Sequence, residues 1–518
     1  MSEQNPQEPI QKTPEQLKAE EEERRKRQER AEQTLKDYWY PSETGEQNEV
    51  LPSLMKNIKR SSPTTKIIDC FVKSTILLIL FVLSRFVLKT ILCYYDSSYP
   101  LFTEENKLFV IICLTLIFII IVSFSYYLGR KDPTIYLAGF ETAIVPDELI
   151  YTNDQFAEYV KEIKIFNEES CAFLKKLVHR AGLGSQTALP PAFHVNPPDD
   201  SYEMGRKEFE ITVKSSCDQL FEKLKINPEK DIDFVVTNCS MFAPTPSLGA
   251  LIMNMYKMKQ TCKNYSFGGM GCSAGLVSVD LAKDILRCHK NVNVLIYSTE
   301  SITRGWYGGQ ERGKLLSNTL FRVGAGAILM SNKSMWKNIA PYKMVTTVRI
   351  HHAKYEESYR AIYQSEDNEG IVGVNLSKKL ANCVSRALVQ NMKILLPQVM
   401  SYKEMFKFLI HLIKQKMGVI DKKEEFRPDF RETFQAFCIH AGGRAIIDGI
   451  QESMGLTDED CMPSRATLYR YGNTSSSSIW YEFKFIERCQ LLKKGDKVWQ
   501  IAFGSGLKCN SCVWKKIK

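Results

Sequence analysis

A cysteine set among glycines is the residue of this chain best suited to nucleophilic chemistry. In the segment SFGGMGCSAGLVSVDLAKDILR, residues 266–287, glycines surround Cys272 and an amphipathic helical pattern follows directly. Glycine permits backbone angles that other residues avoid and lets a substrate approach closely. The segment therefore predicts a reactive thiol at the start of a helix. The alternative is a structural cysteine buried in a glycine turn.

The start of a helix cannot by itself activate such a thiol. A free thiol with a pKa of about 8.5 is only about 3% ionised at pH 7. Lowering that pKa by two units takes about 2.7 kcal/mol, whereas a helix terminus supplies about 0.3–1 kcal/mol and at best about 2. A base near the thiol is therefore expected.

Three later segments contain groups that could assist it. QAFCIHAGGRAIIDGI, residues 435–450, has an apolar strand, His440, small residues and an amphipathic helix, the same order as around Cys272. The alternative for this histidine is a satisfied core residue. YRYGNTSSSSIWYEF, residues 469–483, places Asn473 before a polar run that leads into an aromatic helix. GSGLK, residues 504–508, contains Gly504 and Gly506 in a turn suited to donating backbone N–H groups to an oxyanion.

Strand and helix patterns must hold these segments in place. The short β-branched runs at 233–240 and 291–300 are typical of buried strands, and residues 251–259 and 273–287 have helical apolar spacing. Residues 323–333 and 435–443 are similar to further strands. This alternation predicts an α/β fold, with helices packed on the faces of a sheet.

The first 130 residues differ from this pattern and predict a membrane anchor. Residues 1–65 form a polar tail, and residues 66–130 contain two apolar segments, at about 67–95 and 108–129. The second is 22 residues long without a charge, enough to cross a bilayer, while the first carries Arg85 and Lys89 and is a marginal span. Basic residues outside the pair and acidic residues between them place both ends in the cytosol. The terminal KKIK resembles the di-lysine retrieval signal of endoplasmic reticulum membrane proteins, which is also read from the cytosol.

Composition excludes other classes of protein. The net charge of +10 occurs without a zinc-finger, RNA-binding or recognition-helix pattern, so nucleic acid is not the expected partner, and anionic lipid or a phosphate-bearing substrate explains the charge better. The 15 cysteines do not form a secreted disulfide framework. Cys509 and Cys512 lack a second pair to complete a zinc site, and the adjacent His351 and His352 point to opposite faces of a strand. No metal is expected.

Seven stretches between about residues 133 and 515 form one ordered set: NCSMFAPTPSLGALIMNMYKMK, GGMGCSAGLVSVDLAKDIL, STESIT, LLSNTLFRVGAGAILMSNK, FCIHAGGRAIID, YGNTSSSSIWYE and WQIAFGSGLKCNSCVWK. This set resembles the plant-type 3-ketoacyl-CoA synthases of very-long-chain fatty acid elongation, membrane-tethered relatives of chalcone synthase in the thiolase superfamily. The resemblance implies a thiolase-like condensing domain over residues 131–518, preceded by two N-terminal transmembrane helices. Its fold would be a five-layered αβαβα arrangement of two similar halves, about 131–330 and 331–518, normally as a homodimer.

The family's catalytic cysteine, histidine and asparagine fall on Cys272, His440 and Asn473. The resemblance implies that Cys272 takes an acyl group from acyl-CoA, that malonyl-CoA loses carbon dioxide, and that the enolate attacks the acyl group. His440 and Asn473 would stabilise the thioester oxygen, and CoA thioesters would be substrates with no separate cofactor. Plant relatives often carry histidine at Ala436 and Tyr469, so altered tuning is expected there.

Further candidates and alternatives remain open. Arg322 or Lys508 are candidates to meet CoA phosphates, and Met253 and Met255 to line an acyl tunnel, with core packing as the alternative for the methionines. The expected location is the endoplasmic reticulum membrane with a cytosolic catalytic domain, beside the reductases and dehydratase of an elongation cycle. A type III polyketide synthase-like enzyme and a non-catalytic elongase subunit are the competing functions.

Overall fold

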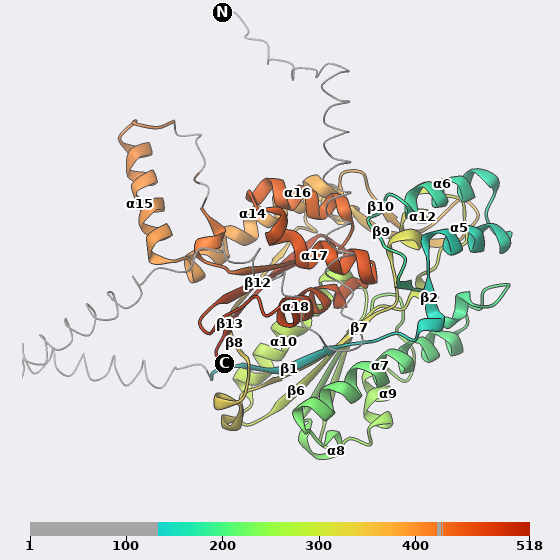
Figure 1. Cartoon of the computed structure of the whole chain (residues 1–518), viewed down its shortest axis with the longest axis horizontal. Helices are drawn as coiled ribbons and strands as arrows, with labels where there is room; N and C mark the ends of the chain where they lie inside the picture. Colours follow the sequence, from blue (N-terminus) through green and yellow to red (C-terminus); the bar gives the residue numbers. More distant parts are fainter. Residues whose placement is uncertain (1–132, 422–425, 427) are drawn as a thin grey trace, which may run out of the picture. The chain divides into compact units, whose positions relative to one another are not determined.

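The computed structural model describes residues 133–421, 426 and 428–518 (Figure 1). The predicted polar tail and both predicted spans, at 67–95 and 108–129, lie outside these residues. Within the described ranges, no helix combines the length and the hydropathy needed to cross a membrane.

Nine strands form the main sheet, in the order β11-β12-β13-β8-β1-β7-β6-β4-β5. The strands expected near 233–240, 291–300, 323–333 and 435–443 are β4, β6, β7 and β11, so the α/β prediction is confirmed. The strand bounds are β1 Tyr136–Thr142, β4 Phe234–Asn238, β5 Lys263–Phe267, β6 Asn293–Thr299, β7 Ala325–Ser331, β8 Tyr342–His351, β11 Ala436–Ile439, β12 Lys497–Gly504 and β13 Lys508–Lys516.

The two ends of this sheet repeat one topology. Strand β4 runs parallel to β6, and β6, β7 and β1 then pair antiparallel. Strand β11 likewise runs parallel to β12, and β12, β13 and β8 pair antiparallel. The two sets meet only where Tyr136 and Leu137 of β1 pair with Lys343 and Tyr342 of β8. The edge strand β5 has no counterpart in the second set.

Helices cover the faces of both half-sheets and fill the space between them (Figure 1). The central helices are α10, Ala274–Cys288, and α18, Ser478–Arg488, whose apolar side chains share one buried cluster with strands of both half-sheets. The first half-sheet is covered on its outer face by α7, Tyr202–Leu224, and α9, Leu248–Met255. The second is covered by α14, Leu380–Val399, α16, Arg444–Met454, and α17, Asp458–Tyr471. The order is therefore helix, sheet, helix, sheet, helix.

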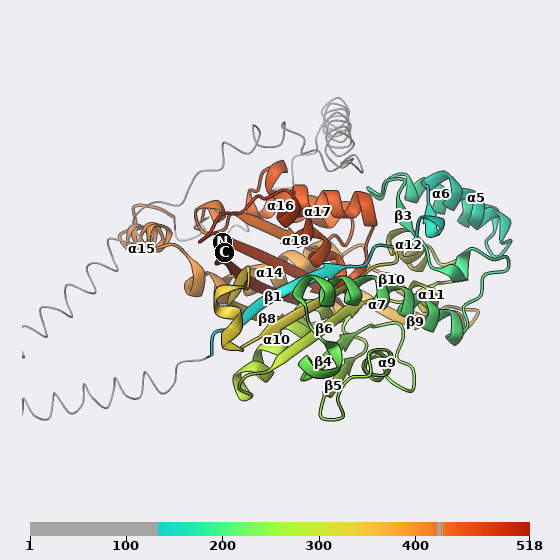
Figure 2. The same ribbon diagram turned by 60° about the horizontal axis from the view of Figure 1, so that its bottom comes forward.

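A side lobe packs beside these layers around its own buried cluster (Figure 2). The sequence patterns did not predict it, because its elements are short and several bury only one side. It contains α5, Asn153–Glu162, α6, Glu168–Val178, α11, Ile302–Gly305, and α12, Arg312–Leu320. Two short pairs of strands accompany it, β2 Ile150–Tyr151 with β3 Thr187–Ala188 and β9 Ile362–Glu366 with β10 Val372–Leu376. Two further short helices are α8, Pro228–Asp231, and α13, Glu356–Tyr359, and the longer helix α15, Tyr402–Lys416, follows α14.

Candidate active site

Cys272 lies in a single 3₁₀ turn, Gly271–Ser273, between the edge strand β5 and the central helix α10. Two of its neighbouring glycines allow other backbone segments to come unusually close. Gly271 has φ +67°, and a Cβ there would lie 2.5 Å from the backbone nitrogen of Ser505. A Cβ on Gly275 would lie 2.3 Å from the carbonyl oxygen of Ser476. The glycines thus bring the two later segments against the Cys272 turn.

The environment of the thiol differs from the one expected from a helix start. Burial raises the pKa of Cys272 to about 12, and Glu300 acts in the same direction. The Ser475 hydroxyl, 3.6 Å from the Cys272 sulfur, and the Asn473 side chain lower the pKa, but less than burial raises it. The donors near the sulfur act in the direction expected for a helix start, but desolvation of the buried sulfur outweighs them and the net shift of the pKa is upward. At rest the sulfur is a neutral thiol.

His440 directly follows strand β11 and is 3% exposed. Burial lowers its pKa to about 4, so the imidazole is neutral at physiological pH. Neither ring nitrogen has a hydrogen-bond partner in the described part of the chain. A buried imidazole without a partner is free to accept a proton from a reacting group. The backbone on either side is fixed, because the Ile439 N–H donates to Ser464 and the Ala441 N–H donates to Glu482.

Asn473 connects the histidine turn to the cysteine turn. Its side-chain nitrogen donates to the carbonyl oxygen of Gly442 at 3.2 Å, and its side-chain oxygen accepts from the Ser475 N–H at 2.8 Å. A Cβ on Gly442 would lie 3.2 Å from Nε2 of His440, so the ring stands directly over this glycine. The fold thus links His440 to Cys272 through Gly442, Asn473 and Ser475, at the ends of separate elements, and of the three predicted residues Cys272 alone lines the cavity described below.

The repeated topology corrects one step of the sequence reasoning. The order strand, reactive residue, small residues, helix occurs at both Cys272 and His440, but the two positions are not equivalent. His440 follows β11, the counterpart of β4, whereas Cys272 follows the unmatched strand β5. The counterpart of the turn before α10 is the turn before α18, which contains Asn473. The two halves therefore contribute different turns to the site.

The serine run after Asn473 is buried rather than a solvated linker. Residues 474–478 are all at most 1% exposed. The Ser476 hydroxyl donates to the Asn238 side-chain oxygen at 2.6 Å, and the Ser298 hydroxyl lies within hydrogen-bond distance of both Asn238 Oδ1 and Ser476 Oγ, at 3.1 and 3.0 Å. Because these hydroxyls have partners, the usual cost of burying them is avoided. The network fixes the turn that faces Cys272.

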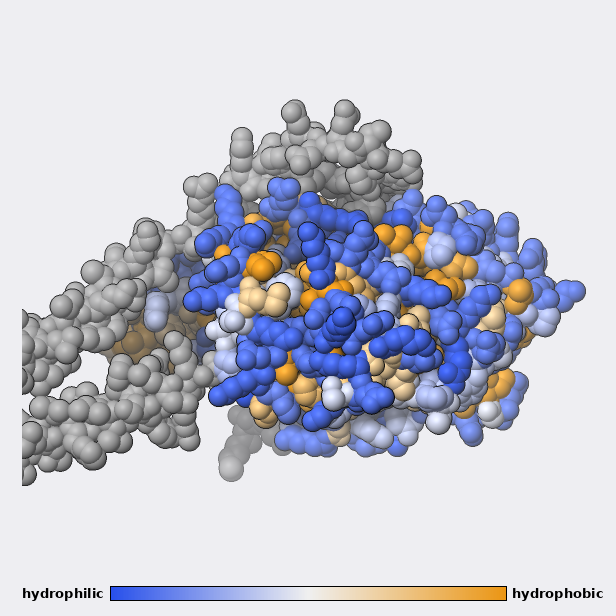
Figure 3. Space-filling view, turned by 90° about the horizontal axis from the view of Figure 1, so that it is seen from below, coloured by the Kyte–Doolittle hydropathy of each residue, from blue (hydrophilic) through white to orange (hydrophobic). Residues whose placement is uncertain are grey.

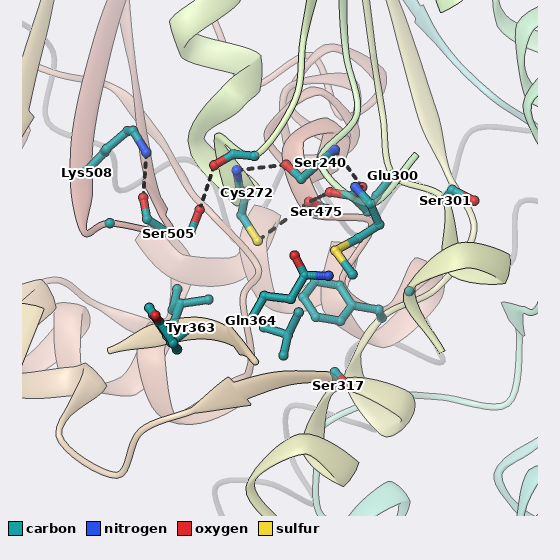
Figure 4. Close-up of a pocket in the computed structure, with 18 of the residues that line it drawn as sticks. Ser240, Cys272, Glu300, Ser301, Ser317, Tyr363, Gln364, Ser475, Ser505 and Lys508 are labelled. Atoms are coloured by element: carbon teal, nitrogen blue, oxygen red, sulfur yellow. Dashed lines mark hydrogen bonds between the residues drawn. The ribbon is translucent and has the colours of Figure 1, made fainter. Parts of the chain in front are cut away.

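Glu300 is a site residue that the sequence reasoning missed (Figure 4). It follows β6 and its carboxylate accepts from the backbone N–H groups of Ser240 and Met241, both at 2.8 Å. It also hydrogen-bonds with the Ser475 hydroxyl at 3.0 Å, so Ser475 lies between Glu300 and the Cys272 sulfur. Burial raises the pKa of Glu300. The available signal was its place in STESIT, a polar segment directly after a buried strand.

The predicted glycine turn packs against the backbone of the Cys272 turn. A Cβ on Gly504 would lie 2.8 Å from the Ser273 nitrogen, and the Ser505 hydroxyl donates to the Gly269 carbonyl at 3.3 Å. Gly506 has φ +68° and lines the cavity described next. This turn therefore packs directly against the backbone of residues 269–273, which includes Cys272.

A cavity of about 470 Å³ opens onto this region. Polar side chains, among them Cys272, Glu300 and Ser475, form one part of its wall. The side lobe supplies an apolar part, with Ile302, Trp306, Phe321, Ile362 and Val374. Lys508 also lines it, next to Gly506 and His351 (Figure 4). A cavity with a nucleophile at one wall and an apolar lining suits a substrate that carries a reactive carbonyl on an apolar chain.

Three of the candidate substrate residues lie elsewhere. Arg322 is 1% exposed, does not line the cavity, and donates to Thr187 and to the carbonyl oxygens of Asn318 and Phe321, so it is not placed to meet CoA phosphates. Met253 and Met255 pack on the outer cluster beneath α9, which is the core-packing alternative. They face away from the cavity because α9 covers the outer side of the first half-sheet.

The two positions where a histidine was expected are structural. Ala436 begins β11 and is buried in the central cluster. Tyr469 packs against Gly184, where a Cβ would lie 2.8 Å from the tyrosine ring, and its carbonyl oxygen accepts from the Gly184 N–H. Neither residue lines the cavity.

Two family models match the chain in sequence. The model described as FAE1/Type III polyketide synthase-like protein matches residues 126–417. The model of the 3-oxoacyl-(acyl-carrier-protein) synthase III C-terminal region matches residues 431–516. Together they cover both half-sheets, the three converging residues and the cavity.

The individual proteins that this chain resembles are 3-ketoacyl-CoA synthases in sequence and type III polyketide synthases in structure. 3-Ketoacyl-CoA synthase 9 of Arabidopsis thaliana is 44% identical over 390 residues, which is 75% of this chain and 76% of that protein. 3-Ketoacyl-CoA synthase 6 of the same plant is 44% identical over 77% of this chain and 80% of that protein. Among solved structures, the C-terminal type III polyketide synthase domain of Steely1 from Dictyostelium matches with a TM-score of 0.60 at 15% identity, over 74% of this chain and 100% of that one. A fungal type III polyketide synthase, ORAS, matches with a TM-score of 0.58 at 16% identity, over 74% and 99%. The structural matches establish the fold.

Proposed function

The chain belongs to the plant-type 3-ketoacyl-CoA synthase family of condensing enzymes, and we propose that Cys272, His440 and Asn473 carry out its reaction. The reaction joins a long-chain acyl-CoA to malonyl-CoA and gives 3-ketoacyl-CoA, carbon dioxide and CoA. It is the first step of very-long-chain fatty acid elongation. The observation that supports the residue assignment is the series of contacts from His440 over Gly442 to Asn473, and through Ser475 to the Cys272 sulfur, which joins turns from both halves of the fold.

In the first stage, the Cys272 sulfur attacks the thioester carbonyl of acyl-CoA. Because thiol and imidazole are both neutral at rest, the thiol proton passes to His440 as the carbon–sulfur bond forms. The N–H groups of Cys272 and of the Gly504 turn stabilise the oxyanion of the tetrahedral intermediate. The bond to the CoA sulfur then breaks, and His440 returns the proton to that sulfur. CoA leaves and an acyl thioester remains on Cys272.

In the second stage, malonyl-CoA loses carbon dioxide and its thioester becomes an enolate. His440 and the Asn473 amide donate hydrogen bonds to the enolate oxygen, since asparagine cannot act as a base. The enolate carbon attacks the acyl carbonyl and the bond to Cys272 breaks. The cysteine sulfur takes up one proton from solvent water, which restores the thiol and balances the carboxylate charge lost with carbon dioxide. CoA thioesters are the substrates, and the proposed steps need no cofactor or metal.

Product analysis in microsomes tests this function. Full-length protein is expressed in a heterologous microsome and given acyl-CoA of varied length with malonyl-CoA, without a reductant. We expect one two-carbon addition per acyl chain, detected by mass spectrometry. Cys272→Ala abolishes it, whereas Cys288→Ala, a change at an exposed cysteine, leaves it unchanged. Products with several successive ketide units identify a polyketide synthase instead, and full activity of Cys272→Ala refutes the nucleophile.

We further propose that residues 66–130 anchor the enzyme in the endoplasmic reticulum membrane, with both termini and the catalytic domain in the cytosol. The uncharged segment 108–129 and the basic flanks of the two spans support this location. Lys515 and Lys516 of the KKIK motif belong to β13, so this motif adds no support. Trypsin added to sealed microsomes then digests the catalytic domain without detergent. Protection until detergent is added contradicts this topology.

Assembly is also a proposal. A homodimer in mild detergent is expected, measured as the mass of the protein by light scattering after subtraction of the detergent. Reductases and a dehydratase of an elongation cycle are the expected neighbours, because a 3-keto product must be reduced and dehydrated before it can be extended again as a saturated chain.

A further inference from the structure

Helix α15 exposes an unusual amount of apolar surface. Of its residues, Tyr402–Lys416, only Glu404 is buried. Phe406 is 63% exposed, Leu409 52%, Ile413 48%, and Met417, directly after the helix, 72%. Figures 1 and 2 show α15 standing out from the layered body. The face of the body drawn in Figure 3 is by contrast mostly hydrophilic, with apolar side chains in small groups.

The exposed side chains of α15 form a pattern. At about 100° per residue, its large apolar residues occupy an arc of roughly 200°. The opposite face carries Lys403, Lys407, His411 and Lys414. Phe426 packs on Phe408 and His411 at one border of the arc and leaves Leu409 and Ile413 exposed. The helix is amphipathic, but its apolar face points away from the described protein core.

Polar contacts hold the first turn of α15 to the body. The Ser401 N–H donates to the Thr433 hydroxyl at 3.3 Å, and Lys403 pairs with Glu432 at 2.7 Å. The buried Glu404 carboxylate accepts from the Asp429 N–H at 3.2 Å and pairs with Lys407. These bonds fix the direction in which the helix leaves the body. The exposed face is therefore presented by a defined attachment.

A lipid surface fits this helix better than a membrane span or a protein groove does. At about 1.5 Å per residue its 15 residues reach about 22 Å, too short to cross a hydrocarbon core of about 30 Å. A bulky apolar face opposite a lysine-rich face is the pattern of helices that lie in the bilayer interface, where lysines meet anionic headgroups. Lys414 and Lys416 are exposed, and the only carboxylate of the helix, Glu404, is buried.

A bilayer is also within reach of the body under the proposed function. The uncharged segment 108–129 ends four residues before the described structure begins at residue 133. We propose that α15 lies in the interface of an anionic bilayer, with Phe406, Leu409 and Ile413 among the acyl chains. Together with the proposed anchor, it gives the catalytic domain a second attachment and thus a fixed orientation on the membrane. This inference rests on the proposed membrane location.

Tryptophan quenching tests the insertion. Full-length Leu409→Trp is reconstituted into phosphatidylcholine vesicles that contain phosphatidylserine, with or without bromine on the phosphatidylcholine acyl chains. The matched control is Met335→Trp, because Met335 is 55% exposed on another part of the surface. Emission is measured as the difference from wild type. We expect blue-shifted emission that bromine quenches for Leu409→Trp, and unquenched emission for Met335→Trp.

Other results overturn the proposal. No quenching at position 409 shows that α15 does not enter lipid, and equal quenching at both positions shows that the lipid contact is not specific to α15. A blue shift without quenching that grows with protein concentration shows that a second copy covers the helix. Vesicle flotation distinguishes a wrong proposal for α15 from a wrong proposal for the membrane anchor at residues 66–130. If residues 66–130 do not insert but α15 binds lipid, the wild-type protein floats with the vesicles. A variant with Phe406, Leu409 and Ile413 changed to serine then does not float. If residues 66–130 do insert, the wild type and the serine variant both float, and the quenching of Leu409→Trp shows whether α15 enters the lipid.

Discussion

Burial keeps both partners of the first proton transfer neutral. The pKa of Cys272 is raised to about 12 and that of His440 is lowered to about 4, so neither group is charged between pH 5 and 9. The resting site is therefore not a thiolate–imidazolium pair. The proton moves only when the bound thioester offers an electrophile, which protects the cysteine from side reactions in the absence of substrate.

The pH dependence of alkylation distinguishes these two states. With a raised pKa, the thiolate fraction of Cys272 grows about tenfold per pH unit across pH 6–9. The rate of iodoacetamide labelling of the Cys272 peptide, followed by mass spectrometry, should rise with pH and show no plateau in this range. A plateau beginning near pH 6 would reveal a preformed ion pair.

Glu300 and Ser475 act on the thiol in opposite directions. The Glu300 carboxylate raises the pKa of Cys272 by repulsion, and the Ser475 hydroxyl lowers it by hydrogen bonding. Glu300→Gln keeps an acceptor for the Ser240 and Met241 N–H groups and removes the charge. It should speed labelling of Cys272 at pH 8 several-fold, because the repulsion is removed, and Ser475→Ala should slow it several-fold, because a donor to the thiolate is lost. Slower labelling in Glu300→Gln contradicts this assignment.

Asn473 is expected to act in the second stage of the reaction and not in the first. Asn473→Asp keeps the size of the side chain but replaces the amide donor with a carboxylate. The acyl-enzyme should still form, whereas condensation should fall by about 100-fold or more, because one donor to the enolate oxygen is lost and a negative charge is added beside it. Stopped assays that measure CoA release and 3-ketoacyl-CoA separately check this. Equal loss of both stages would mean that Asn473 mainly holds the fold.

At the scale of elements, close backbone contacts hold the site together. Gly275 in the first turn of α10 meets the Ser476 carbonyl, where an added Cβ would lie at 2.3 Å. Gly275→Ala should lower the free energy of unfolding by about 1–3 kcal/mol, because backbone must move, and should also reduce activity. The control is Gly449→Ala in α16, where a Cβ meets nothing within 4 Å and should stabilise the helix by up to about 1 kcal/mol. Chemical denaturation measures both, and equal effects would show that the contact is unimportant.

The elements of this site were predictable to different degrees. The strands β4, β6, β7 and β11 and the helix α10 follow from local apolar patterns and were predicted from them. The buried state of the serine run and the role of Glu300 depend on partners 60 to 238 residues away in sequence, such as Asn238 and Ser240. Local patterns do not contain that information. The net rise of the thiol pKa could not be predicted for the same reason, because burial of Cys272 arises from packing between the halves.

At the scale of the whole molecule, the chain has five N-glycosylation sequons that can report topology, at Asn238, Asn264, Asn332, Asn375 and Asn473. Asn238 and Asn473 are 1% and 3% exposed and could not carry a glycan in the folded protein. Asn264, on the edge strand β5, is exposed and is the informative one. In a cytosolic domain it stays unmodified, so endoglycosidase H leaves the electrophoretic mobility of the protein unchanged. A shift that Asn264→Gln abolishes would place the domain in the lumen.

The duplicated architecture explains why the site needs the entire domain. The first half supplies Cys272 and Glu300, the second supplies His440, Asn473 and the Gly504 turn, and the side lobe supplies the apolar cavity wall. Each half alone would present an incomplete set of groups. The central claim is that Cys272, assembled in this way, carries the acyl chain.

Mass analysis of the acyl-enzyme tests that claim most directly. Purified full-length protein is incubated with a long-chain acyl-CoA without malonyl-CoA, digested, and mapped for acylated cysteines, with Cys288→Ala as background to remove an exposed thiol. The account predicts one acyl adduct on the Cys272 peptide, which malonyl-CoA discharges as 3-ketoacyl-CoA. An adduct on another cysteine that malonyl-CoA discharges, or condensation that proceeds in Cys272→Ala, would contradict it.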